Sequence, residues 1–444
     1  MSQVWKTRRL PIQPGPAAWN RLLPEPAPAV ELSTAVNADV AIIGAGFAGL
    51  SAARRLIQLD PDLRIAVLEA GRIAEGPAGR NSGFMIDLPH DLSSDIYAGA
   101  AIEADQAETA LNRRAIAFAT DVSEENELPQ EVFNPYGKIN AAATSAGDQH
   151  NREYGVHLAN MGESYRLLDA REMSELTGIR YYVSGLFTPG TVMLQPAAYI
   201  RGLAGGLKSK VSIYEQSPVL EIIGQPGGWM LKTPKGKISA GRVILANNGH
   251  AESFGFFVRR LMHVFTYASM TKPLPEGVLG GELQWGVTPA DPMGTTVRRV
   301  NGVGGNRIVV RSRFTYNPSM TVSEGALARA GALHDKKFAA RFPMLGGIPM
   351  EYRWAGHLCV SLNGVQAHGE VAKGVFSAVC QNGLGLAKGT LSGISAAELA
   401  MGQDTETTRA LCAMDPPRRL PPEPLAWLGA NTTMKWKEWR AGRE

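Results

Sequence analysis

Three glycines and one carboxylate near the start of the chain have the spacing of a nucleotide-binding motif. Gly44, Gly46 and Gly49 form a G-x-G-x-x-G pattern, and Glu69 follows 20 residues after the last of them. The first glycine allows a tight turn, the second lets the backbone approach a pyrophosphate, and the third lets a helix pack closely on a strand. A carboxylate at this distance can accept hydrogen bonds from both ribose hydroxyls of a dinucleotide, and it would repel a 2′-phosphate. The pattern therefore predicts a dinucleotide site that suits NADP poorly.

The residues around this motif indicate a strand, a turn, a helix and a second strand. Residues 40–43 are a short apolar run suited to a buried parallel strand, and residues 65–68 are another that ends at Glu69. The helix between them would begin at the glycine turn, where its free N–H groups and its dipole favour phosphate. A G-x-G-x-x-G pattern alone is weak evidence, but strand, helix and terminal acid in this order make the dinucleotide interpretation strong.

The composition is that of a folded globular protein. Of the 444 residues 44% are hydrophobic and 19% are charged, which excludes a disordered chain and leaves room for more than one domain. The net charge of +4 is small and no basic run is interleaved with aromatic residues, so we expect no nucleic acid partner. Three cysteines without metal spacing, no leader-like segment and no bilayer-length apolar stretch lead us to expect no metal, no membrane span and a cytoplasmic location.

Two later segments also place a glycine loop after an apolar strand. Residues 211–249 are typical of successive short strands, and the last of these ends in Asn247-Asn248-Gly249. Residues 375–402 are typical of a strand, a loop with the sequence Asn382-Gly383-Leu384-Gly385, and a helix of small residues. We expect the N-terminus of that helix to point at the ligand, and close packing by glycine and alanine is the structural alternative.

These patterns predict an α/β fold in which a Rossmann-like nucleotide-binding domain carries an inserted α+β substrate domain built on a mixed or antiparallel sheet. The predicted pieces are an extended N-terminal arm at 1–37, nucleotide-binding segments at 38–95, 166–255 and 349–412, a helical segment of the substrate domain at 96–165, its main body at 256–348, and a tail helix at 413–444. The tail puts Trp436 and Trp439 on one face of a short basic helix. We expect it to dock on the chain itself, with contact to a partner as the alternative.

Five segments together resemble a known family. They are GAGFAGL (44–50), VLEAGR (67–72), GRNSGF (79–84), VILANNG (243–249) and QNGLGLAKGTLSG (381–393). The set is similar to the FAD-dependent D-amino-acid oxidase superfamily, and most similar to its bacterial γ-glutamylputrescine oxidase-like branch. The resemblance runs from about Trp19 to Gly402. Residues 79–83 are its most specific part, although Ser82 stands where the family's G-R-N-G-G loop has a glycine.

The resemblance implies FAD as the cofactor, held without a covalent bond. Glu69 would hold the adenosine ribose, the backbone of Val219 would meet the adenine, and Ala246 would lie near the pyrophosphate. Residues 79–83 would run under the flavin, and residues 382–385 would cover its C2 carbonyl. The cofactor-binding residues that we predict are Gly44, Ala45, Gly46, Phe47, Ala48, Gly49, Glu69, Ala70, Arg72, Gly79, Arg80, Asn81, Ser82, Gly83, Val219, Ala246, Asn382, Gly383, Leu384 and Gly385. Cys359 is the alternative point of covalent attachment, because one branch of the family carries its flavin on a cysteine in this region.

The same resemblance implies oxidation of a C–N bond in a small amine or amino acid. The substrate C–H would face flavin N5 and lose a hydride equivalent, and water would hydrolyse the resulting imine to a carbonyl and an amine. Residues 351–356 resemble the strand beside the substrate cavity. Amino-acid-specific relatives have an arginine for the α-carboxylate two residues after the glycine that corresponds to Gly356, but this chain has Leu358. An amine without an α-carboxylate, or with a carboxylate farther away, fits Leu358 better.

The catalytic residues are less well defined. Our candidates are His357, which follows the cavity strand directly, and Arg353 and Arg298, which could bind a substrate carboxylate. Arg311 and Arg313 are further arginines that could do so. His90 and His263 are also expected near the flavin, more as structural hydrogen-bonding groups than as catalysts.

Two questions stay open on the sequence alone. Oxygen or an electron carrier could reoxidise the flavin, and Lys272 and Lys388 are candidates for a lysine near N5 that would favour oxygen. The alternatives to an amine oxidoreductase are an NAD-dependent dehydrogenase and a flavin-bearing dehydrogenase subunit that passes electrons to a partner in a larger complex. An oligomer is compatible with each of these.

Overall fold

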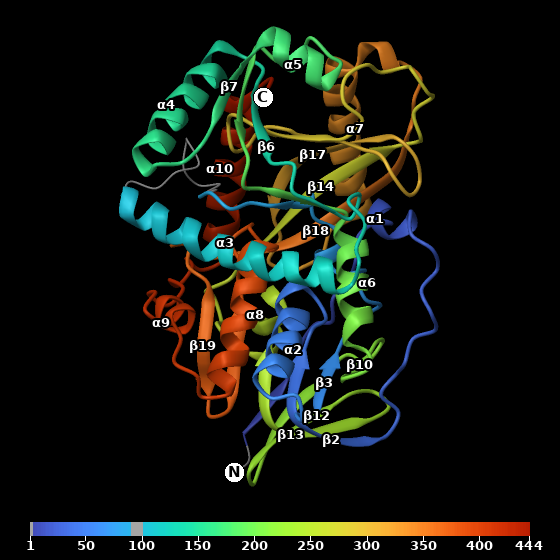
Figure 1. The fold of residues 1–444 in the computed structure, drawn as a ribbon. Coiled ribbons are helices and arrows are strands. Elements are labelled where there is room, and N and C mark those ends of the chain that lie inside the picture. The colour runs from blue at the N-terminus through green and yellow to red at the C-terminus, as the bar shows by residue number, and fades with distance from the viewer. Residues whose placement is uncertain (1–2, 90–100) are drawn as a thin grey trace.

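The structure, a computed structural model, describes residues 3–89 and 101–444. These residues form two large β-sheets, a lower one and an upper one in Figure 1, each covered by helices. None of the helices in the described ranges has both the length and the apolar character needed to span a lipid bilayer.

The lower sheet has nine strands. They are β1 (Val4–Lys6), β2 (Ala35–Ile43), β3 (Ile65–Leu68), β10 (Val211–Tyr214), β11 (Glu221–Gln225), β12 (Gly228–Lys232), β13 (Lys237–Leu245), β19 (Ala367–Ala372) and β20 (Val375–Val379). Its centre is parallel in the order β20-β13-β2-β3-β10, and an antiparallel meander of β11, β12 and β13 continues it, with β1 at the edge. This arrangement confirms the predicted Rossmann-like fold.

Both faces of the parallel strands are covered, which explains why their sequences are continuous apolar runs. Val40 and Ile42 pack toward α2 (Phe47–Leu59), α6 (Pro196–Leu207) and α8 (Ala387–Ala400), and α3 (Ile102–Glu125) packs across α8. Ala41 and Ile43 pack on the other face, against the meander and the 3-10 helix η2 (Asn248–Phe254).

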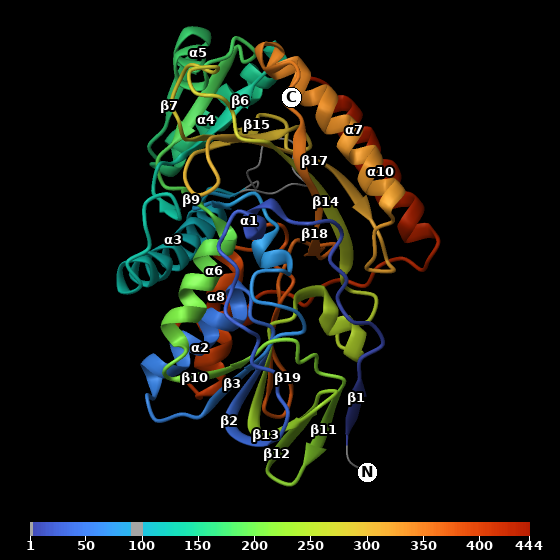
Figure 2. The same cartoon turned by 90° about the vertical axis from the view of Figure 1, so that its right-hand side faces the viewer.

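The upper sheet has eight strands in the order β18-β14-β17-β16-β15-β6-β8-β7. Their bounds are β6 (Lys138–Ala142), β7 (Arg166–Asp169), β8 (Ser184–Thr188), β14 (Met262–Thr271), β15 (Trp285–Pro289), β16 (Thr296–Val300), β17 (Arg307–Tyr316) and β18 (Met350–Val360). Every pair is antiparallel except β6 with β15, so the sheet is mixed, as predicted for the substrate domain. Figure 2 shows it arching across the upper half of the molecule. A small third sheet joins β4 (Phe84–Met85), β5 (Phe133–Asn134) and β9 (Val192–Leu194).

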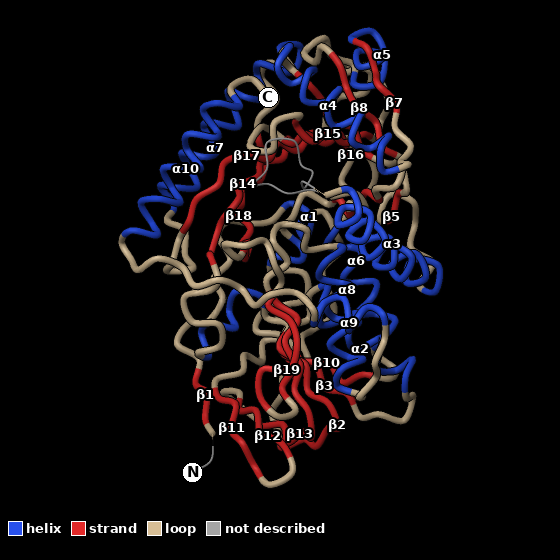
Figure 3. Tube along the Cα trace, turned by 90° about the vertical axis from the view of Figure 1, so that its left-hand side faces the viewer, coloured by secondary structure: helices blue, strands red, loops and turns tan. Residues whose placement is uncertain are grey.

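Helices cover the outer side of the upper sheet. α4 (Ser145–Met161) and α5 (Ala170–Thr177) pack at the end formed by β6, β7 and β8, whereas α7 (Glu324–Arg341) and α10 (Leu425–Ala441) pack at the end with β17 (Figures 2 and 3). The tail helix α10 thus docks on the chain itself. The remaining short elements are α1 (Ala18–Arg21), α9 (Glu406–Cys412), η1 (Pro77–Gly79) and η3 (Pro343–Leu345).

Sheet membership differs from the predicted division of the chain at three places. Residues 166–188, assigned from the sequence to the nucleotide-binding domain, supply β7 and β8 of the upper sheet, and residues 350–360 supply its β18. The N-terminal arm is not wholly extended, because β1 pairs with β11 and α1 buries Trp19. A short strand shows its own pattern but not the identity of its partner strand, which tertiary packing decides.

Candidate active site

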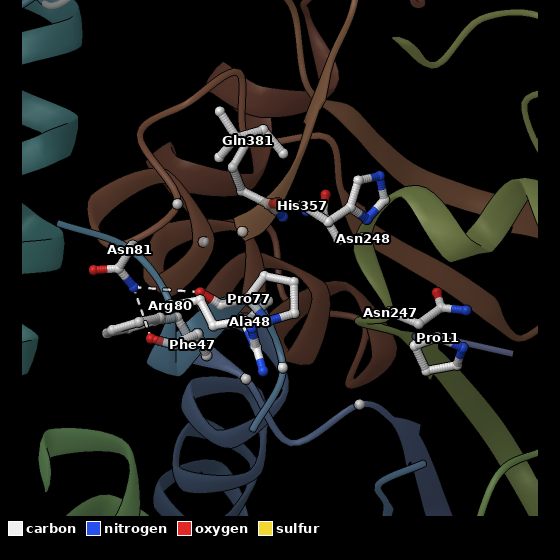
Figure 4. A pocket seen from close by; sticks show the side chains of 18 of the residues that line it. Pro11, Phe47, Ala48, Pro77, Arg80, Asn81, Asn247, Asn248, His357 and Gln381 are labelled. Atoms are coloured by element: carbon white, nitrogen blue, oxygen red, sulfur yellow. Dashed lines mark hydrogen bonds between the residues drawn. The ribbon is translucent and has the colours of Figure 1, made fainter. Parts of the chain in front are cut away.

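A cleft opens where the parallel strands of the lower sheet end and the upper sheet begins. Its walls come from the ends of β2, β3 and β13, from the loop before β4, and from β17 and β18. Of the predicted cofactor residues, the following line it: Gly44, Ala45, Gly46, Phe47, Ala48, Glu69, Ala70, Arg80, Asn81, Ser82, Val219, Ala246, Gly383, Leu384 and Gly385. Figure 4 shows Phe47 and Asn81 on one side of this pocket and Pro11 and Asn247 on the other. The fold therefore gathers loops that are far apart in the sequence.

The first glycine turn has no room for side chains. Gly44 has a φ of +109°, and a Cβ there would lie 2.7 Å from the carbonyl oxygen of Ala246. A Cβ on Gly49 would lie 1.8 Å from the carbonyl oxygen of Gly44, so only glycine lets α2 approach the strand this closely. α2 begins directly after Gly46, and its first residues form part of the cleft wall. The positive end of a helix dipole therefore meets the cleft, as anion binding requires.

Glu69 connects the end of β3 to this turn. Its carboxylate accepts a hydrogen bond from the N–H of Ala45 at 2.9 Å and another from the N–H of Gly71 at 3.0 Å. Burial raises the pKa of Glu69, and the backbone N–H groups of Gly71 and Ala45 oppose that shift. One donor on each oxygen leaves further lone pairs of the carboxylate for ribose hydroxyls.

The loop of residues 79–83 is fixed through its carbonyl groups. Trp354, Trp19 and Arg298 donate, in that order, to the carbonyl oxygens of residues 80, 81 and 82, at 2.9, 2.8 and 2.8 Å. All three donors are buried, and they come from β18, α1 and β16. The loop is thus held against the cleft from three directions by the protein itself.

The side chain of Arg80 ties this loop to other segments. Its guanidinium donates to the carbonyl oxygens of Glu75 at 2.6 Å, Pro14 at 2.9 Å, Gly15 at 3.0 Å and Ala355 at 3.2 Å. Burial lowers the pKa of Arg80 to about 10. Arg80 therefore stays charged at neutral pH and joins the N-terminal arm, the loop and β18.

The third loop leads into α8. The side-chain oxygen of Asn382 accepts from the N–H of Ser361 at 2.8 Å, so this side chain shapes the loop and does not line the cleft. Gly383, Leu384 and Gly385 do line it, and α8 begins two residues later. A second helix N-terminus thus meets the same cleft as the first.

A chain of side-chain contacts leads from Glu252 through His263 on β14 to His357 on β18, which lines the cleft. Nε2 of His263 lies 2.7 Å from Oε2 of Glu252, and Nδ1 of His263 lies 3.3 Å from Nε2 of His357. Because a carboxylate only accepts, Nε2 of His263 is the donor to Glu252, and Nδ1 of the same ring contacts His357. Burial lowers the pKa of His357 well below its ordinary value, with help from His263 and His250, and lowers the pKa of His250 to about 4. His357 and His250 both line the cleft and are neutral near pH 7.

Two of the predicted catalytic candidates, Arg298 and Arg353, lie outside the cleft lining. Arg298 does not line the cleft, because its Nη1 donates to the carbonyl oxygens of Ser82 and Leu194, both at 2.8 Å. Burial lowers the pKa of Arg298 to about 9. Arg353 also lies outside the cleft lining, because it faces α7 and donates to both carboxylate oxygens of Asp335 at 2.8 and 3.0 Å.

Five of the predicted cofactor residues lie behind the cleft wall: Gly49, Arg72, Gly79, Gly83 and Asn382. Arg72 pairs with Glu215 at 3.1 Å. A Cβ on Gly79 would lie 1.9 Å from the carbonyl oxygen of Ala74, so this glycine shapes the loop. His90 falls outside the described residues, and neither Lys272 nor Lys388 lines the cleft in the part of the chain that the structure describes.

Several residues that line the cleft were not predicted from the sequence, and Arg311 was named only as one of several arginines that could bind a carboxylate. Arg311 lines the cleft from β17, and Thr288 and Thr296 line it from β15 and β16. His250 and Gln381 follow β13 and β20. The position of His250 and Gln381 at the ends of parallel strands was a usable signal, because ligands bind at that edge of such sheets. Nothing local distinguishes Arg311 from its neighbours.

Three buried polar atoms on the cleft wall have no hydrogen-bond partner among the described residues, which indicates room for a polar ligand. They are Asn247 Oδ1, His250 Nδ1 and Thr266 Oγ1. Buried polar groups are normally paired, so these atoms need a ligand or solvent. With two helix N-termini for phosphate and Glu69 for ribose, the residues present fit an adenine dinucleotide that carries a polar ring system.

Comparisons with known proteins agree with this geometry. A family model described as FAD dependent oxidoreductase, DAO, matches residues 39–399. A probable oxidoreductase OrdL of Haemophilus influenzae is 27% identical over 377 residues, covering 83% of this chain and 84% of that protein. The gamma-glutamylputrescine oxidoreductase of Escherichia coli K12 is 23% identical over 396 residues, covering 85% and 86%. The crystal structure of glycine oxidase from Geobacillus kaustophilus matches with a TM-score of 0.68 at 20% identity, over 84% of this chain and 96% of that one.

The family match spans most of the chain, so the protein belongs to the DAO family of FAD-dependent oxidoreductases. FAD is its cofactor, which decides against the NAD alternative and confirms the resemblance seen in the five sequence segments. At 20% identity, the likeness to glycine oxidase shows the fold alone.

Proposed function

We propose that this protein oxidises a C–N bond of a small amine or amino acid. The observation that carries the proposal is the contact between the loop of residues 79–83 and the cavity strand: a Cβ on Gly356 would lie 3.4 Å from the carbonyl oxygen of Arg80. The strand segment with His357 and Leu358 thus passes directly beside the loop that resembles the family's flavin loop. The name of the gamma-glutamylputrescine oxidoreductase, a relative matched over 85% of this chain, contains an amine, which supports this substrate class.

Under this proposal FAD lies along the cleft without a covalent bond. Glu69 would hold the ribose, the N-termini of α2 and α8 would face the negative groups of the cofactor, and residues 80–82 would lie against its ring system. A non-covalent flavin is supported at Cys359, which is buried, does not line the cleft, and has a thiol whose pKa is raised well above the ordinary value by burial.

FAD bound there supplies the acceptor for the electron pair that the substrate carbon gives up as a hydride equivalent. The nitrogen lone pair forms the C=N bond, and water then hydrolyses the imine to a carbonyl and an amine. The protein must keep the amine neutral, and burial lowers the pKa of an ammonium group without a dedicated base. His357, which is neutral near pH 7 and lines the cleft beside the loop of residues 79–83, is the group that we propose to hold the amine in place.

Arg311 is the cleft residue best suited to an acidic group on the substrate. Leu358 stands at the position where the amino-acid-specific relatives have an arginine for the α-carboxylate. Arg311, in contrast, lines the cleft from β17, with its guanidinium 4.8 Å from the ring of Phe314. We therefore propose a substrate whose carboxylate is distant from the oxidised carbon, with Arg311 as its partner.

An anaerobic screen of amines and amino acids, scored by bleaching of the flavin absorbance, tests the proposed function. It needs no assumption about the final electron acceptor. We expect bleaching with at least one primary or secondary amine. A well-flavinated protein that stays oxidised with every amine but bleaches with a hydroxy acid would show that the C–N assignment is wrong.

The proposal is compatible with reoxidation of the flavin either by oxygen or by an electron carrier. Lys388 pairs with Glu108 at 3.0 Å and lies outside the cleft lining, so neither lysine considered from the sequence favours oxygen. A stopped-flow comparison of reoxidation by oxygen and by a soluble quinone distinguishes an oxidase from a dehydrogenase.

A further inference from the structure

The tail helix α10 has two contrasting faces. Its inner face docks on the upper sheet: Asn431 exchanges hydrogen bonds with the backbone of Tyr316, both at 3.0 Å, and Glu438 pairs with Arg313 at 3.0 Å. Met434 packs in a cluster with Phe314. The helix is therefore held firmly by one side, and the other side faces outward.

The outward side carries large apolar residues where a solvent-facing helix would carry polar ones. Leu425, Leu428, Trp436 and Trp439 are 63%, 58%, 52% and 77% exposed, and their spacing of three, eight and three residues places them on one stripe of a helix. Three of the eight tryptophans in the chain are exposed, and all three lie on α10. We call these four residues the outer stripe.

The charges around the outer stripe are positive. Lys435 and Arg440 lie on its two sides, and the guanidinium of Arg440 sits 5.1 Å from the ring of Trp436. The carboxylates of this part of the chain turn elsewhere: Glu438 faces Arg313, Glu423 binds the hydroxyl of Tyr316, and Glu444 accepts from the N–H of Ala143. Lys435 and Arg440 therefore flank the stripe, and Arg440 also lies 3.8 Å from the carboxylate of Asp291.

We propose that the outer stripe docks on an anionic lipid surface. Tryptophan and leucine on one face, with basic side chains along the edges, is the pattern of a helix that lies in the plane of a membrane interface. The apolar side chains enter the headgroup region, and the ammonium group of Lys435 meets the lipid phosphates. The proposal does not depend on the substrate of the cleft.

Sedimentation of the flavin-loaded protein with vesicles tests this proposal. We expect binding to vesicles of equal parts phosphatidylglycerol and phosphatidylcholine, weak binding to phosphatidylcholine alone, and weaker binding as salt increases. The double substitution W436S/W439S should lower the partition coefficient by about tenfold or more. Lys435→Glu should weaken binding mainly at low salt. The flavin spectrum and the unfolding midpoint should not change, because these side chains are exposed.

Trp427→Ser is the matched control, because Trp427 is 49% exposed on the same helix but lies away from the outer stripe. It should leave vesicle binding unchanged. An equal loss with Trp427→Ser, or no binding to anionic vesicles, overturns the proposal. Self-association seen by light scattering and abolished by W436S/W439S also overturns it, since the stripe would then be a contact between copies of the chain.

Discussion

Each carboxylate oxygen of Glu69 accepts a hydrogen bond from a backbone N–H group. An amide has only one acceptor oxygen and therefore cannot replace both contacts. In Glu69→Gln one oxygen becomes an NH₂ group that faces the N–H of Ala45 or of Gly71. The turn must then shift, and the ribose loses a charged acceptor. We expect FAD affinity to fall by about tenfold to a hundredfold, the effect of one or two hydrogen bonds to a charged group. Titration of the apoprotein, followed by flavin fluorescence, measures this.

The pH dependence provides the control for this variant. Because burial raises the pKa of Glu69, its carboxyl gains a proton at higher pH than a free glutamate does, so wild-type affinity should fall as the pH drops towards that raised pKa. Glu69→Gln cannot gain a proton there and should lose that part of the pH dependence. The same pH profile in both proteins would contradict the assigned role.

Arg311 and Arg313 show how a strand irregularity decides which side chain serves the cleft. Residues two apart on a strand normally share a face, but Arg313 has a φ of +69° and is skipped in the pairing, since Thr266 faces Phe314 while Tyr267 faces Ser312. Arg313 thereby turns to Glu438 of α10, whereas Arg311 lines the cleft.

Arg311→Met should therefore raise KM for amines that carry a distant carboxylate by about tenfold or more, with little effect on neutral amines. Steady-state kinetics on a matched pair of substrates measures this. Arg353→Met is the control, because Arg353 pairs with Asp335 outside the cleft lining. If both variants raise KM equally for acidic and for neutral amines, Arg311 does not bind the carboxylate.

Single residues were predictable from sequence where local spacing determines the geometry. Gly44, Gly49 and Glu69 belong to one strand–turn–helix–strand unit, so their relation is set within a short stretch of chain. Arg298 and Arg353 were not, because the direction of an arginine depends on what lies across the sheet. Carbonyl groups near β4 attract the first, and a carboxylate on α7 attracts the second.

Among the elements, the pair α2 and α8 depends on small residues in contact. A Cβ on Gly393 would lie 2.0 Å from the carbonyl oxygen of Ala48, so the two helices pack backbone to backbone. Gly393→Ala must push them apart, and the first residues of α2 line the cleft where we propose that the phosphates bind. We expect a loss of about 1–3 kcal/mol in the free energy of unfolding, together with weaker FAD binding.

Gly429→Ala is the matched control, because Gly429 lies on exposed α10 with nothing within 4 Å of its would-be Cβ. That change should stabilise the protein by about 0.5–1 kcal/mol, as alanine does in an open helix. Urea unfolding of both variants measures the difference. Equal stability of the two would contradict the close packing of α2 and α8.

The elements themselves were largely visible in the sequence, but their assignment to sheets was not. The parallel strands β2, β3, β13 and β20 are apolar runs followed by glycine loops, which marks them as one class. By contrast β7, β8 and β18 are short or mixed in pattern, and their place in the upper sheet follows from neighbours far along the chain.

For the whole molecule, the cleft is a product of both sheets meeting at one edge. The lower sheet supplies the dinucleotide loops, the upper sheet supplies His357 and Arg311, and Arg80 and Trp354 bond the two together. A motif search finds the first half because its residues act through backbone geometry. The second half acts through side chains whose partners are set only when the upper sheet forms, so the sequence could indicate a substrate region but not its contacts.

The stability of the whole molecule should depend on pH because it buries neutral histidines. Burial lowers the pKa of His250, His334 and His368 to about 4 each. In the unfolded chain these groups titrate near the ordinary value of about 6.5, so below that pH the unfolded state binds protons that the folded state does not. Their contribution is fully present above about pH 6.5 and is lost as the pH falls towards 4, by at most about 3 kcal/mol for each histidine.

His334→Asn isolates one of these groups. His334 is 1% exposed, and its Nδ1 lies 2.8 Å from the hydroxyl of Ser269, a contact that the asparagine amide can replace. We expect urea unfolding at saturating FAD to show that the free energy of unfolding falls less steeply between pH 6.5 and 4 in the variant. The difference in slope should correspond to the uptake of up to one proton fewer on unfolding. An identical slope in the wild type and the variant would mean that His334 gains its proton in the folded state. Its burial would then cost the fold nothing in acid.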